Sequence, residues 1–205
     1  MNTLSLFNLC SNLANADDAQ YITTVRKESI MEKTGKVSLV GYILALEINY
    51  TAKSPIINLE KVLSYCVISN IEKSNFPLTK SEEERDELQL WKIINTLGYD
   101  LQKGIGFNIF NDWSSAEEVN NKEGFVLRLA TAHSEIHKIW EESVMLRNRF
   151  YLKKSEYVQG ELGDLSAKCE FTFENQPEVQ QYLTTQITNL TKTLDTINSM
   201  SNRDL

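Results

Sequence analysis

The residues with the clearest capacity for chemistry are the chain's two histidines, His133 and His137. They stand four residues apart in a segment with helical periodicity, and on a helix that spacing places both imidazoles on one face, one turn apart. Neutral imidazole nitrogens bind Zn, Fe or Mn, and helical bundles combine such pairs with carboxylates. Glu141 continues the same row, so these three side chains are the candidate ligands of a divalent transition metal.

The same pair also has a purely structural interpretation, which the sequence favours. The segment reads His-Ser-Glu-Ile-His and therefore lacks the glutamate that directly follows the first histidine in zinc-hydrolase motifs. Histidines at the edge of an apolar face often bond to backbone or to a nearby carboxylate instead. The cofactor stays unknown at this point. Since no serine elbow, P-loop or activated-cysteine motif occurs either, the sequence leans against an enzyme.

A long helix from about Phe125 to Lys153 is expected to carry the histidines. Its apolar side chains recur at three- and four-residue steps, the pattern of a helix with one face in the core. They are Leu129, Ala132, Ile136, Ile139, Leu146 and Phe150. The end of this segment holds Arg147, Arg149, Lys153 and Lys154 without an acid among them. This basic patch is a candidate contact for nucleic acid or an acidic partner, although cations at a helix C-terminus also complement the helix dipole.

Residues 155–175 change character. Cys169, Phe171 and Phe173 alternate with polar residues after a glycine-containing stretch, which predicts an antiparallel β-hairpin. A helix followed by a hairpin also leaves open a winged-helix-like, DNA-associated accessory subunit, by analogy of fold alone.

The last predicted helix spans residues 177–201, with Pro177 in its first turn. Its apolar residues repeat at the a and d positions of a heptad, while the rest of the helix is mostly Thr, Gln and Asn. They are Leu183, Ile187, Leu190, Leu194 and Ile197. Such a seam folds back onto its own core or binds a partner, so these residues are the candidate partner-binding surface.

The first hundred residues are expected to form a helical N-terminal part. A helix from Asp17 to Lys33 would end at Gly35, a typical position for a helix-stopping glycine. Val37–Ile48 is apolar nearly all round, so it is a buried helix or a buried strand, and its Leu and Ala content favours helix. Further helices are predicted from Leu59 and over Glu82–Leu97, and residues 101–124 connect this part to the second half, 125–205.

Composition limits the class of protein. The chain has 205 residues, 41 % of them hydrophobic and 24 % charged, which is ordinary for a soluble globular protein. Its net charge of −7 disfavours broad binding to a phosphate backbone. Cys10, Cys66 and Cys169 follow no metal-binding pattern, so reduced, partly buried thiols and a cytoplasmic location are expected. The longest apolar run is too short to cross a membrane.

Together these features predict a mainly α protein with a small antiparallel β-hairpin, an α+β fold. The predicted function is a non-catalytic intracellular interaction protein, a subunit or adaptor that binds a protein partner or a second copy through its C-terminal helix. Two alternatives stay open: a metal-dependent helical enzyme that uses His133 and His137, and the DNA-associated accessory subunit with its local basic patch.

Overall fold

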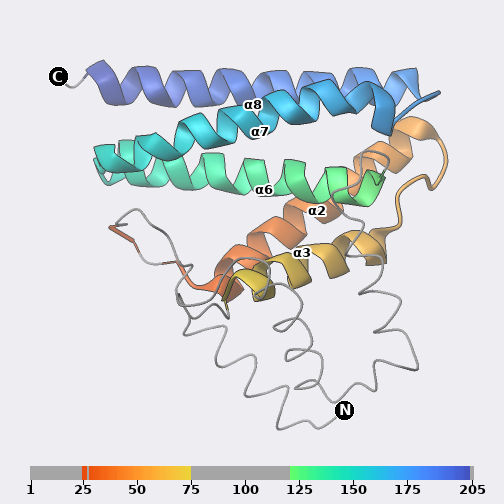
Figure 1. The fold of residues 1–205 in the computed structure, drawn as a ribbon, viewed down its shortest axis with the longest axis horizontal. Helices are drawn as coiled ribbons and strands as arrows, with labels where there is room; N and C mark the ends of the chain where they lie inside the picture. Colours follow the sequence, from red (N-terminus) through yellow and green to blue (C-terminus); the bar gives the residue numbers. More distant parts are fainter. Residues whose placement is uncertain (1–24, 27, 75–120, 204–205) are drawn as a thin grey trace, which may run out of the picture.

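The computed structural model describes residues 25–26, 28–74 and 121–203 as a set of packed helices (Figure 1). In chain order they are α2 (Ile30–Ala52), α3 (Leu59–Ser74), α6 (Lys122–Trp140), α7 (Lys153–Thr172) and α8 (Pro177–Arg203). A π-helical turn (Glu141–Met145) and a 3₁₀ turn (Arg149–Leu152) connect α6 to α7. The predicted helix at Glu82–Leu97 and the connecting segment up to residue 120 lie outside the described residues.

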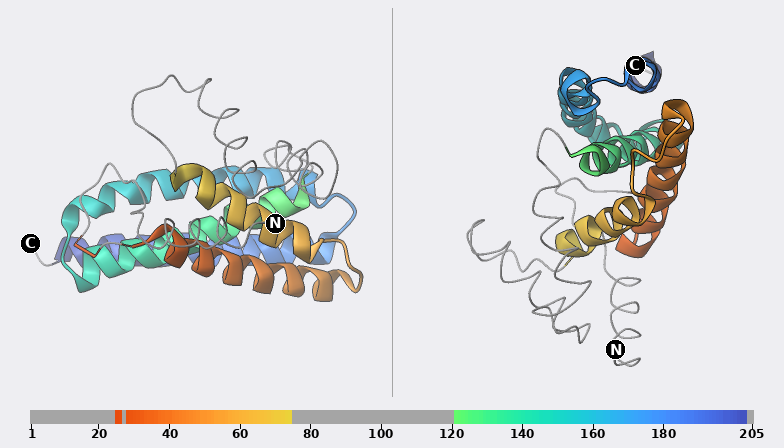
Figure 2. Two further views of the ribbon diagram at one scale, coloured as in Figure 1. Left: turned by 90° about the horizontal axis from the view of Figure 1, so that it is seen from below. Right: turned by 90° about the vertical axis from the view of Figure 1, so that its right-hand side faces the viewer.

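Helix α6 lies at the centre of this arrangement and packs against each of the other four described helices. Figure 1 shows α7 and α8 on one side of α6 and α2 and α3 on the other, and Figure 2 shows the same arrangement from two further directions. The helix that carries the histidines is therefore also the helix that joins the two halves of the core.

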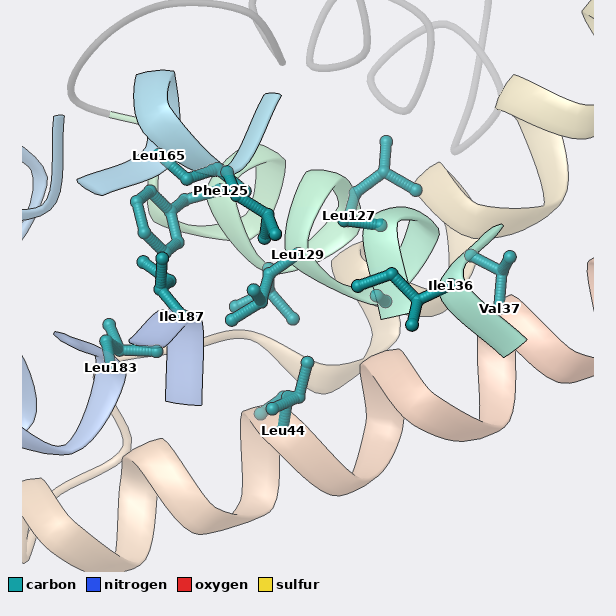
Figure 3. Close-up of a cluster of buried hydrophobic side chains, with 14 of the residues drawn as sticks. Val37, Leu44, Phe125, Leu127, Leu129, Ile136, Leu165, Leu183 and Ile187 are labelled. Atoms are coloured by element: carbon teal, nitrogen blue, oxygen red, sulfur yellow. The ribbon is translucent and has the colours of Figure 1, made fainter. Parts of the chain in front are cut away.

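The core is apolar and continuous from α2 to α8. Figure 3 shows side chains from four helices pointing into one shared space: Leu44 from α2, Phe125 and Leu129 from α6, Leu165 from α7, and Leu183 and Ile187 from α8. The rings of Phe125 and Phe173 meet edge to face with centroids 5.3 Å apart, a favourable aromatic geometry.

The N-terminal helix differs in its start from the prediction. Helix α2 begins after Ser29, whose hydroxyl accepts a hydrogen bond from the backbone N–H of Glu32 at 3.1 Å. The expected end at Gly35 is wrong, because Gly35 lies inside α2 and the apolar run Val37–Ile48 continues the same helix. The preference for helix over strand in that run is confirmed.

The predicted β-hairpin at 155–175 is wrong. Residues 153–172 form α7, and no β-strand occurs in 25–26, 28–74 or 121–203, so the mainly α expectation holds without its β element. Val158, Leu162, Leu165 and Cys169 are buried at helical spacing, whereas Phe171, which suggested strand alternation, is exposed. The winged-helix interpretation depended on that hairpin and loses its structural basis.

The long helix predicted over residues 125–153 is also interrupted. The α-helix ends at Trp140, and Arg147 adopts a left-handed backbone with φ 56°. The backbone N–H of Asn148 bonds to the carbonyl of Glu142 at 2.7 Å, which closes the turn. By contrast, the terminal helix does begin at Pro177, as predicted, after Asn175 takes a left-handed conformation with φ 64°.

Candidate functional site

The two histidines lie on the exposed face of α6. The imidazole of His137 faces the indole of Trp140 with ring centroids 5.9 Å apart. Partial desolvation lowers the pKa of His133, a hydrogen bond to its own backbone raises it, and positive charge on His137 lowers it further. The predicted spacing on one helix is therefore present, with both rings at the surface.

The third predicted ligand, Glu141, is already engaged by cations. Its carboxylate accepts a hydrogen bond from the guanidinium of Arg26 and lies 3.8 Å from the Nζ of Lys138. Desolvation raises the pKa of Glu141, but the hydrogen bond and charge of Arg26 outweigh it and lower the pKa overall. Within the part of the chain that the structure describes, no group of three His, Cys, Asp or Glu side chains is placed to hold a metal ion.

A second acidic residue of α6, Glu135, points into the protein and binds two lysines. Its two carboxylate oxygens lie 2.7 Å from the Nζ of Lys33 on α2 and 2.7 Å from the Nζ of Lys154 on α7. Burial raises the pKa of Glu135, but the two lysine charges outweigh burial and lower it. Glu135 therefore ties α2 and α7 to α6.

A third acid, Glu142, sits fully buried in the π-helical turn and holds the segment before α2. Its carboxylate accepts the backbone N–H groups of Val25 and Arg26 at 2.8 and 2.9 Å. Asn148 donates to it at 3.0 Å, and the Nζ of Lys138 is 3.5 Å away. Burial raises the pKa of Glu142, and these donors and the charge lower it overall. The acids around α6 thus stabilise the fold.

The predicted basic patch divides in the structure. Lys154 turns inward to Glu135, while Arg147, Arg149 and Lys153 are exposed around the connection between α6 and α7. The patch comprises three surface cations rather than four.

The two described cysteines are buried and are not joined in a disulfide. Cys66 and Cys169 are free and buried, whereas Cys10 lies outside the described residues. Burial raises the pKa of Cys66 to about 12, which keeps this thiol protonated and unreactive.

The apolar seam of α8 faces the interior of its own chain. Leu183, Ile187, Leu194 and Ile197 are buried, and Leu190 is partly buried against the same core. In this structure the residues predicted to bind a partner instead pack against α2, α6 and α7.

An organised apolar surface that the sequence reasoning missed lies on α2. The outer face of α2 consists of Leu39, Tyr42, Ile43, Leu46 and Tyr50, which are 62, 39, 50, 42 and 83 % exposed. Val37, Gly41 and Ile48 on the opposite face are buried. Figure 2 (right) shows α2 at the edge of the molecule, with α3 and α6 on one side of it. The sequence signal for this surface was the run Val37–Ile48, which is apolar nearly all round. Because the chain packs on one side of α2, the apolar residues on its other side remain exposed.

The outer face of α2 is nearly free of charge. Among the exposed positions of α2 between residues 35 and 50, Glu47 is the one charged residue. Soluble proteins rarely expose large contiguous apolar patches, so this face is a candidate interaction surface.

Comparison with known proteins identifies a fold. No protein-family model and no curated protein matches the sequence. Among solved structures, the chain is similar to an HD-domain phosphohydrolase from Listeria innocua, with a TM-score of 0.51 and 14 % sequence identity. The likeness covers 92 % of this chain and 99 % of that one. At this identity the likeness concerns the helical fold. No helix in the described ranges has the length and apolar character needed to cross a membrane.

Proposed function

We propose that this chain is a non-catalytic protein-interaction protein, and that the outer face of α2 is its binding surface. The observation that carries the proposal is the set of five exposed apolar side chains on one face of α2. The partner that fits is a helix with its own apolar stripe, because Leu39, Ile43, Leu46 and Tyr50 follow each other at helical spacing.

The chemistry of this face supports binding. It includes Tyr42 and Tyr50, and tyrosine is enriched among the residues that dominate binding energy at protein interfaces. Polar chemistry near α6 is directed inward: Glu135 binds Lys33 and Lys154, and Glu142 binds backbone N–H groups. These acids hold helices together, so their carboxylates are not available as an acid, a base or a metal ligand.

Site-specific photo-crosslinking in cells tests this proposal. A photoreactive amino acid replaces Tyr50 in one variant and Tyr157, an exposed tyrosine of α7, in a matched control. The expected result is a discrete protein adduct from position 50 that disappears when Ile43→Glu is added, with no such adduct from position 157. Equal adduct patterns at both positions, or none at position 50, contradict the proposal.

The second candidate is a metal-dependent helical phosphohydrolase. The likeness to an HD-domain phosphohydrolase supports this candidate more than the first. His133 and His137 would be metal ligands, and Glu141 the third ligand or the base. Bound metal supplies Lewis acidity and an activated water. The described residues offer the two imidazoles, while Glu141 is held by Arg26, so a complete site needs ligands from outside them.

Metal analysis combined with an activity assay tests the second candidate. The purified chain is equilibrated with Mn²⁺ or Zn²⁺, dialysed, and assayed for metal content and for hydrolysis of p-nitrophenyl phosphate. An enzyme of this class is expected to retain stoichiometric metal and to lose both metal and activity in the His133→Ala/His137→Ala double variant. Identical metal content and hydrolysis in wild type and double variant eliminate this candidate.

A further inference from the structure

We infer that the partner of the outer face of α2 is a second copy of this chain, so that the protein forms a homodimer through α2. This inference rests on the proposed function and names the partner for the same surface. It is carried by the spacing of the exposed residues, their types, their lack of charge and the area they offer.

The spacing is that of a two-helix seam. Leu39, Ile43, Leu46 and Tyr50 follow each other at steps of four, three and four residues, which is the a/d pattern of a coiled coil. Ile43 and Tyr50 take the a positions, and Leu39 and Leu46 take the d positions. A β-branched residue at a with leucine at d favours two paired helices over larger assemblies.

The polarity of the face allows it to meet an identical face. In a two-fold interface each patch contacts its own copy, so any charge in its centre would meet a like charge. The four seam residues are uncharged; the exposed charged residues near them are Glu47, beside the seam, and Lys53, one turn beyond Tyr50. Self-pairing of this face therefore involves no buried like-charge pair within the seam.

The backbone on this face also permits close approach. Gly35 lies one turn before Leu39, is exposed, and has no atom within 4 Å of where a Cβ would be. A neighbouring helix can therefore come near the backbone at this end of the seam.

The extent of the exposed face bears on how tightly two copies would bind. Two tyrosines and three aliphatic residues on this face are 39–83 % exposed, and Met31, further along α2, is 50 % exposed. Specific interfaces bury about 800 Å² per partner, and weaker ones bury less. A face built on five exposed apolar side chains is small by this standard, so we expect a reversible dimer.

The test is the oligomeric state of the full chain over a wide range of concentrations, measured by sedimentation equilibrium. Wild type is expected to be dimeric at the upper end of the range. Ile43→Glu and, separately, Leu46→Lys are each expected to raise the dimer dissociation constant at least about tenfold, which corresponds to 1.4 kcal/mol or more. Tyr157→Glu, at a side chain of similar exposure on α7, is expected to leave the constant unchanged.

A second measurement does not depend on charged substitutions. Leu46→Cys in a Cys10→Ser background places a single accessible thiol near the middle of the seam, because Cys66 and Cys169 are buried. Mild oxidation is expected to yield a disulfide-linked dimer from this variant and none from Tyr157→Cys in the same background.

The inference and the proposed function fail in different ways. A wild-type chain that stays monomeric throughout, or a dimer that neither Ile43→Glu nor Leu46→Lys weakens, overturns the homodimer. An adduct from position 50 with a mass other than that of two copies also overturns the homodimer but supports the proposed function. Absence of any adduct at position 50 overturns the proposed function itself.

Discussion

Helices α2 and α8 carry apolar residues at the same heptad-like spacing, yet one seam is covered and the other is open. In α8, Leu183, Ile187, Leu194 and Ile197 are buried by the chain itself. In α2, the residues from Leu39 to Tyr50 on the outer face are exposed, because the core is satisfied by Val37, Leu44 and Ile48 on the inner face. The remainder of α8 is polar, so it has one apolar face to bury. Helix α2 has two apolar faces, and its own chain covers one of them.

The largest effect is expected when the covered face of α2 loses its attachment to α6. Glu135→Gln is expected to lower the free energy of unfolding by about 3–5 kcal/mol, because Lys33 and Lys154 lose the charge that compensates them in a buried position. Urea unfolding followed by circular dichroism measures this. Glu161→Gln, which removes a more exposed partner of Arg128, is the matched control and should cost less than about 1 kcal/mol.

The pH dependence of stability provides a second check on Glu135. Its pKa is lower in the folded chain than the ordinary value of 4.5, so the folded state binds fewer protons than the unfolded state in that range. The stabilisation is present above pH 4.5 and is lost as the pH falls through the folded-state pKa. Glu135→Gln should therefore flatten the acid limb of the stability profile; an unchanged limb would contradict the assigned role.

The two seams are compared directly by Leu183→Ala and Leu46→Ala. Leu183 is fully buried in α8, and its truncation is expected to cost about 2–5 kcal/mol through lost burial and a cavity. Leu46 is exposed on α2, and its truncation should change monomer stability by no more than about 0.5 kcal/mol. Denaturant unfolding at low protein concentration separates monomer stability from dimerisation. Equal losses in both variants would mean that the two seams are covered alike.

Two glycines of α2, one on each face, are expected to respond in opposite ways to substitution by alanine. A Cβ at Gly41 would meet the Sγ of Cys66 at 3.1 Å and Val62 at 3.2 Å, so Gly41→Ala is expected to destabilise by about 1–3 kcal/mol. A Cβ at Gly35 meets no atom within 4 Å, so Gly35→Ala should stabilise by about 0.5–1 kcal/mol through helix propensity. Thermal melts of dilute protein report both signs. A stabilising Gly41→Ala would mean that α3 does not pack closely on α2 at this point.

The last prediction concerns the thiol under the inner face of α2, where no change in stability is involved. Cys66 should react with a thiol reagent far more slowly in the folded chain than after unfolding, because it is buried and its pKa is about 12. Labelling of Cys66, resolved by peptide mass spectrometry, measures the ratio of the two rates. Comparable rates would show that α2 separates readily from α3.

The regular helices were within reach of sequence reasoning, and their interruptions were not. The periodicity from Leu59 and from Pro177 predicted α3 and α8, because a sustained apolar stripe at helical spacing is typical of a helix that packs on a core. The hairpin prediction was wrong because Phe171 is an exposed aromatic that imitates strand alternation. The break after Trp140 depends on Glu142, whose carboxylate accepts hydrogen bonds from the side chain of Asn148 and from the backbone N–H of Arg26. The second of these donors is far away in the sequence, so no local pattern contains it.

The candidate site was less predictable than the fold. The spacing of His133 and His137 correctly placed both on one helical face, but the apolar pattern put them at the edge of the core, whereas both rings are exposed. The sequence also did not show that Glu141 is occupied by Arg26. Similarly, the apolar character of Val37–Ile48 indicated burial, while which half of it is covered depends on where α3, α6 and α8 pack. Exposure is a property of the assembled chain.

The binding of Val25 and Arg26 by Glu142 also has a consequence for biosynthesis. The bonded residues are 116–117 positions apart in the chain. At ribosomal rates of about 5–20 residues per second, α2 therefore emerges on the order of ten seconds before the carboxylate that anchors its leading segment. Helix α6, which covers much of the inner face of α2, is made only at the end of that interval. Until then the part of the inner face of α2 that α3 does not cover is exposed together with the outer face, and such transiently exposed apolar surface favours aggregation.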